Sequence, residues 1–182
     1  GNGLLLIGTW LQGSAGGWLT WELTHSPAWL GIMAMADFAP VFLLGPLGGA
    51  LADRYSRIMV MVWAQVAAAL SALVLFALSA SGILNVWHLT IFTFLTGCAV
   101  GINQPARLSL APSLVPPELL TTAISLNAMI FNGARFVGPM ISTAVITLWS
   151  IHGSFLINAC SYTALIIALL SLKIPRRERP ET

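Results

Sequence analysis

The chain has 182 residues, of which 57% are hydrophobic and only 8% are charged. A soluble domain carries about 25% charged residues, so this composition excludes a globular protein that covers its surface with polar side chains. The chain is built for the lipid bilayer, and its net charge of +2 gives no reason to expect a nucleic-acid partner.

Six apolar segments follow one another, separated by charges and turn residues. They are predicted as helices over residues 3–23, 29–51, 58–80, 86–106, 118–148 and 153–173. Because about 20 helical residues cross the hydrocarbon, we predict an all-α membrane protein. Its six-helix bundle covers residues 1–173, and 174–182 start a polar cytoplasmic linker. The first apolar run begins almost at Gly1, so we expect a fragment cut inside its first span.

The first two spans contain polar residues that suit a membrane pathway. Small residues, two of them threonines, share one face of the first span, with Gln12 beside it; these are Thr9, Gly13, Gly16 and Thr20. Such a face suits a cavity and helix packing equally well. In the second span, Asp37 is a costly interior charge. We interpret Asp37 as a candidate for proton coupling, with a structural hydrogen bond or an ion pair to Arg135 as the alternative.

A dense group of charges joins the second and third spans. It reads G-x-L-x-D-R-x-S-R and contains Gly49, Asp53, Arg54, Ser56 and Arg57. This resembles the loop signature of the major facilitator superfamily, although Ser56 replaces the usual glycine. The resemblance implies a conformational latch at the cytoplasmic ends of two helices. A plain anchor of positive charge is the alternative. Three nearby glycines are expected to admit a neighbouring helix: Gly45, Gly48 and Gly49.

The fourth span carries small residues on one face and a basic residue at its end. The face consists of Thr93, Gly97 and Gly101, and Arg107 follows as a candidate cytoplasmic charge partner. The superfamily resemblance implies that the first and fourth helices line the transport cavity. Close packing against another helix explains the same residues equally well.

The fifth span contains Gly133, Gly138 and Pro139. These residues resemble the Gly-Pro motif in the fifth helix of superfamily exporters, although Ser142 and Thr143 replace the usual closing glycine pair. Proline removes a backbone hydrogen bond and bends a helix, so the resemblance implies a hinge; ordinary tight packing is the alternative. The same span offers two candidate contacts for a substrate, which are Arg135 and Asn132.

Nearly the whole chain resembles one bacterial branch of the superfamily, through residues 21–31, 102–120 and 132–139. That branch includes the enterobactin exporter and the macrolide efflux proteins. The resemblance covers only the N-terminal half of a twelve-helix fold. It implies alternating access and proton-driven export of drug-like or siderophore-like molecules. Similar Gly-Pro segments at 42–50 and 136–144 favour two inverted three-helix repeats.

The basic residues between and after the spans all fall on one side of the predicted membrane. They are Arg54, Arg57, Arg107, Lys173, Arg176, Arg177 and Arg179. By the positive-inside rule this side is cytoplasmic, so both ends of the fragment are expected in the cytoplasm. Tryptophans near the opposite boundary fit an outer aromatic belt. We expect a multi-pass protein of the bacterial inner membrane.

These features favour a secondary transporter whose partners are the bilayer, a small molecule, protons and a missing C-terminal half. The alternative is a membrane scaffold or half-protein without transport. An intramembrane enzyme is not expected, because the histidines lie in outer turns and no carboxylates are paired. Cys98 and Cys160 lie in apolar runs without metal-ligand neighbours, so we expect neither a metal nor a cofactor.

Overall fold

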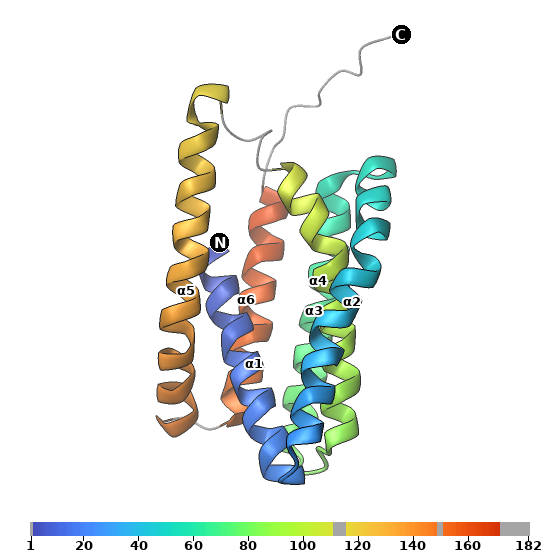
Figure 1. Ribbon diagram of the computed structural model, residues 1–182, viewed down its shortest axis with the longest axis vertical. Coiled ribbons are helices and arrows are strands. Elements are labelled where there is room, and N and C mark those ends of the chain that lie inside the picture. The colour runs from blue at the N-terminus through green and yellow to red at the C-terminus, as the bar shows by residue number, and fades with distance from the viewer. Residues whose placement is uncertain (1, 111–115, 149–150, 172–182) are drawn as a thin grey trace.

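The structure is a computed structural model that describes residues 2–110, 116–148 and 151–171. Within these ranges, side chains are described except at residues 2–7, 109–110, 117, 120, 135 and 151–152. The elements run in the order α1 (Asn2–Thr24), α2 (Pro27–Arg54), α3 (Arg57–Ala80), α4 (Val86–Leu110), η2 (Pro117–Leu119), α5 (Leu120–Leu148) and α6 (Ile151–Ser171) (Figure 1). The described part of the chain is therefore all-helical, as predicted.

Each predicted span coincides with one long helix. Within the described residues, α2 to α6 each contain a stretch long and apolar enough to cross a membrane. Helix α1 has 23 residues and is thus about 34 Å long, which also exceeds the hydrocarbon thickness. The chain is a multi-pass membrane protein. The predicted boundary at residue 173 lies outside the described residues.

The turn between α1 and α2 forms where the sequence predicts it. Pro27 opens α2, and Ser26 occupies the N-cap position with extended backbone angles (φ −123°, ψ 119°). The Ser26 side chain makes no capping hydrogen bond. Its amide instead donates to the hydroxyl of Thr24 over 3.3 Å. The chain reverses at His25, which adopts a positive φ of 48°.

The helices pack in two groups that are joined through α3 and α6. Helix α1 packs against α5 and α6, whereas α4 packs against α2 and α3. Helices α5 and α2 lie on opposite flanks of the bundle (Figure 1). These flanking helices are the least covered. Only 17% of the residues in the apolar stretch of α2 and 18% of those in α5 are buried, against 50% in α3.

Glycines set the distance between α2 and α4. A Cβ atom on Gly97 would lie 2.6 Å from the Asp37 carbonyl oxygen, and one on Gly48 would lie 2.8 Å from the Cα of Ile102. No real Cβ contact is this short, so the two backbones touch because these residues lack side chains. The expected close approach is confirmed at Gly48. It is wrong for Gly45 and Gly49, where a Cβ would meet nothing within 4 Å.

Candidate functional site

A polar cluster joins α1 to α6; we define it as the buried Gln12, Asn158 and Tyr162 together with the exposed Thr9. The Asn158 side-chain amide donates to Oε1 of Gln12 over 2.5 Å. Asn158 is 0% exposed and Gln12 is 8% exposed. The Tyr162 hydroxyl lies close to the side chains of Asn158 and Thr9. Among the described residues, however, neither this hydroxyl nor Oδ1 of Asn158 makes a well-formed hydrogen bond.

Asp37 lies in the membrane-spanning helix α2, at the point where Gly97 of α4 packs against its carbonyl oxygen. The sequence interpretation treats Asp37 as an interior charge, yet its side chain is exposed in the described half. An exposed carboxylate at this depth is costly against lipid. The two observations are consistent when the face of the bundle that carries Asp37 meets water or protein.

The Gln12–Asn158 hydrogen bond is expected to contribute measurably to stability. Substituting either residue by alanine leaves the other side chain without its partner in a dry interior. A double-mutant cycle of Gln12→Ala and Asn158→Ala should give a coupling energy of about 0.6 kcal/mol, with about 1.7 kcal/mol as an upper bound. Reversible unfolding in mixed micelles measures it.

Asn132 provides the matched control for that cycle. It is exposed on α5, and its amide donates to the carbonyl oxygen of Ala128 in its own helix over 2.8 Å. Asn132→Ala combined with Asn158→Ala should show additive effects within about 0.5 kcal/mol. A coupling of zero between Gln12 and Asn158 would contradict the hydrogen bond as a stabilising contact.

The residues of the charged motif lie at the end of α2, in the turn after it and at the start of α3, with Gly49 and Asp53 inside α2. Arg54 ends α2, Ser56 occupies the N-cap position of α3, and Arg57 is the first residue of α3. These residues and Asp53 are exposed, and Arg57 also makes an interaction within the chain. The half-buried Arg107 lies in the last turn of α4, at the same end of the bundle (Figure 1). The latch function stays a prediction.

The three candidate hinge residues of α5 differ in their surroundings. Gly138 is buried, and a Cβ there would lie 2.7 Å from Cβ of Trp10 in α1, so this glycine serves close packing. A Cβ on Gly133 would meet nothing within 4 Å, and Pro139 is exposed. The hydroxyls of Ser142 and Thr143 donate to the carbonyl oxygens of Gly138 and Pro139 over 2.8 and 3.0 Å. Bending at this site stays a prediction.

Arg135 occupies the middle of α5, but its side chain lies outside the described residues. Its proposed ion pair with Asp37 is therefore not tested. The two residues belong to helices on opposite flanks of the bundle (Figure 1). Among the residues that the structure describes, no group of three or more His, Cys, Asp or Glu side chains is placed to hold a metal ion.

Neither Tyr162 nor Asn158 is among the candidate site residues predicted from the sequence. A usable signal was present, because Ser154, Asn158 and Tyr162 follow one another at intervals of four within an apolar span. That spacing places them on one helix face. All three are almost completely buried, so the face is turned into the bundle.

Long apolar helices with interior polar groups define a helical membrane bundle, the architecture expected for half of a major facilitator superfamily protein. The chain belongs to the transmembrane secretion effector family of this superfamily, whose family model matches residues 3–181. This match agrees with the resemblance seen in the sequence motifs.

Three of the relatives are bacterial proteins whose names describe transport or efflux. The chain is 26% identical to the uncharacterized MFS-type transporter YfiS of Bacillus subtilis, with 95% of this chain and 42% of YfiS aligned. It is 25% identical to the staphyloferrin A transporter of Staphylococcus aureus, covering 98% of this chain and 45% of that protein. Macrolide efflux protein A of Enterococcus faecalis is 26% identical, covering 79% and 45% respectively. The chain thus spans less than half the length of these relatives.

Proposed function

We propose that this chain is the N-terminal half of a secondary active exporter of small amphipathic molecules, drug-like or siderophore-like, that works by alternating access. The observation that carries the proposal is the position of exposed polar groups on the two flanking helices. Asp37 of α2 and Asn132 of α5 are both exposed in this half. Neither group is favourable in contact with lipid tails, and a second bundle with a hydrated cavity would accommodate both.

The apolar surface of the same two helices supports a protein partner. Large exposed side chains line α2 and α5: Met35, Phe38, Phe42, Leu43, Leu47, Met129, Phe136, Val137 and Met140. A second six-helix half would cover much of this surface beside the polar groups. The relatives are more than twice as long as the aligned region, which leaves room for such a half.

The helix packing supports two inverted three-helix repeats. The first helix of one unit, α1, packs against the second and third helices of the other unit, α5 and α6. In the same way α4, the first helix of the second unit, packs against α2 and α3. Three-helix units that follow one another through a membrane have opposite orientations. We therefore propose that α1 and α4 are equivalent helices facing the cavity.

The proposed transport cycle uses the polar groups described above. Asp37 binds the coupling proton, and the α2–α3 turn stabilises one closed state at the cytoplasmic end. Both ends of the chain lie in the cytoplasm, because the loop cations gather there. The relatives named for staphyloferrin A and macrolides support an amphipathic substrate class. No enzymatic reaction is part of this proposal.

The chain by itself is expected not to transport. One wall of the cavity is missing, so neither closed state can form. Vesicles that contain the complete protein should extrude an amphipathic dye under a proton gradient. Vesicles with residues 1–182 alone should show at most the background leak, about tenfold or more below that rate. Dye extrusion by the half-length chain would contradict the proposal, and a complete protein that extrudes no dye or siderophore would favour the scaffold alternative.

A further inference from the structure

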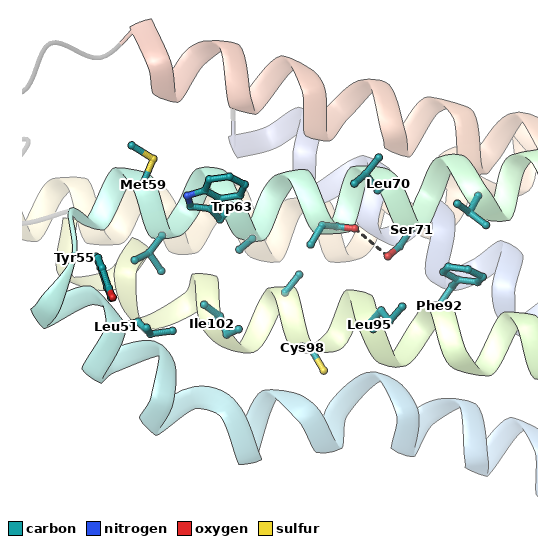
Figure 2. A pocket seen from close by; sticks show the side chains of 15 residues that line it. Leu51, Tyr55, Met59, Trp63, Leu70, Ser71, Phe92, Leu95, Cys98 and Ile102 are labelled. Atoms are coloured by element: carbon teal, nitrogen blue, oxygen red, sulfur yellow. Dashed lines mark hydrogen bonds between the residues drawn. The ribbon is translucent and has the colours of Figure 1, made fainter.

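An apolar groove lies on the membrane-spanning surface between α3 and α4 and reaches the turn that joins α2 to α3 (Figure 2). Its volume is about 670 Å³. The wall is formed mainly by large apolar side chains, among them Leu51, Met59, Trp63, Leu70, Phe92 and Ile102. All the lining residues come from α2, α3 and α4 and the turn after α2, so the groove is separate from the polar cluster between α1 and α6.

We propose that this groove binds the acyl chain of an anionic phospholipid, with the headgroup phosphate at the α2–α3 turn. The first argument is the polarity of the groove. Ser71 is its one hydroxyl away from the turn, and that hydroxyl donates to the carbonyl oxygen of Ala67 over 2.9 Å. The groove interior therefore offers an occupant almost no unpaired polar group. A hydrocarbon chain fits such a wall, whereas a polar ligand would lose its hydrogen bonds to water.

The second argument is the length and direction of the groove. Its wall extends along α3 from Met59 to Val74, a rise of about 22 Å. One leaflet of the hydrocarbon is about 15 Å thick, so a single acyl chain can lie in the groove over its whole depth. Because α3 is long and apolar enough to cross the membrane, the groove runs in the direction of the lipid tails.

The third argument is the charge at the open end. Tyr55 lines the groove beside the turn, and Arg54 and Arg57 lie on either side of it in the chain. All three side chains are exposed, as is the one carboxylate of the turn, on Asp53. Two cations against one acid leave the turn positive. Each basic side chain at the membrane surface raises the affinity for an anionic headgroup about fivefold.

The test measures the affinity of the purified complete protein for 1-palmitoyl-2-oleoyl phosphatidylglycerol and for the phosphatidylcholine with the same chains. Native mass spectrometry counts the bound lipids. Ala67→Phe fills the groove, because Ala67 is an exposed lining residue. Ala164→Phe is the matched control, since Ala164 is exposed on α6 outside the groove. We expect Ala67→Phe to lower phosphatidylglycerol affinity at least about fivefold and Ala164→Phe to leave it unchanged.

Charge is tested by a second substitution. Arg54→Gln should lower the affinity for phosphatidylglycerol about fivefold and leave that for phosphatidylcholine unchanged. Equal affinities of the unaltered protein for the two lipids would overturn the headgroup assignment. Equal effects of Ala67→Phe and Ala164→Phe would overturn the groove as the binding site. Absence of lipid binding in the complete protein would also overturn the groove as the binding site. It would indicate that the second half covers the groove.

A measurement on the unaltered protein guards against misfolding of Ala67→Phe. Trp63 lines the groove and is 67% exposed, so a lipid with brominated tails in the groove quenches its fluorescence. In nanodiscs, brominated phosphatidylglycerol should quench this signal at mole fractions well below those needed with brominated phosphatidylcholine. The preference should vanish in Trp63→Phe. Quenching that depends only on the total brominated fraction would overturn the proposal.

Discussion

Gly97→Ala is expected to destabilise the bundle by about 1–3 kcal/mol, the usual cost of an overpacked site. The added Cβ would lie 2.6 Å from the Asp37 carbonyl oxygen and 3.1 Å from that of Ala36. Both atoms belong to the backbone of α2, which cannot rotate away as a side chain can. Helices α2 and α4 must therefore separate along their contact. Thermal unfolding of the purified protein in detergent measures the loss.

Gly45→Ala is the matched control for this substitution. Gly45 also lies in a membrane-spanning helix, but a Cβ there meets nothing within 4 Å. Alanine has the higher helix propensity by about 1 kcal/mol, so Gly45→Ala should be neutral or slightly stabilising. Equal stability of the Gly97→Ala and Gly45→Ala proteins would contradict the close contact between α2 and α4.

Asp37→Asn is expected to lower efflux by the complete protein about tenfold or more, which corresponds to about 1.4 kcal/mol or more in the barrier. This prediction rests on the proposed proton-coupled function. Asparagine keeps the size of the side chain and its hydrogen-bonding capacity but cannot bind and release a proton at working pH. Because Asp37 is exposed in this half, the substitution should leave folding intact. Initial rates of proton-driven dye extrusion, normalised to folded protein, provide the measurement.

Glu22→Gln serves as the control for the loss of one carboxylate. Glu22 is exposed two residues before the end of α1, at the boundary of the predicted span. Its neutralisation should leave the efflux rate unchanged. Full activity of the Asp37→Asn protein would exclude Asp37 as the coupling group.

The charged turn and the α5 motif show which properties of the protein a motif resemblance predicts. It identified the superfamily, and the family match over residues 3–181 agrees with it. It did not distinguish the functions of the individual glycines. Gly138 and Gly133 belong to the same motif, yet the first packs against Trp10 and the second has open space beside it. Which glycine touches a neighbour depends on how each helix is rotated, and a short motif does not contain that information.

The sequence by itself determined the number, order and approximate bounds of the membrane helices. The physical reason is local: a helix must present about 20 apolar residues to cross the hydrocarbon, and polar turns interrupt the runs. Pro27 marks the start of α2 for an equally local reason, since proline is favoured in the first turn.

Only the tertiary structure decided which polar residues meet. Gln12 and Asn158 are 146 positions apart in the chain, yet their side chains form a hydrogen bond between α1 and α6. Apolar helices have weakly periodic sequences when lipid surrounds the bundle, because both the lipid-facing and the buried faces are hydrophobic. The packing of small residues, such as Gly97 against α2, sets the rotation of each helix. That rotation decides whether a polar side chain points into the bundle or away from it.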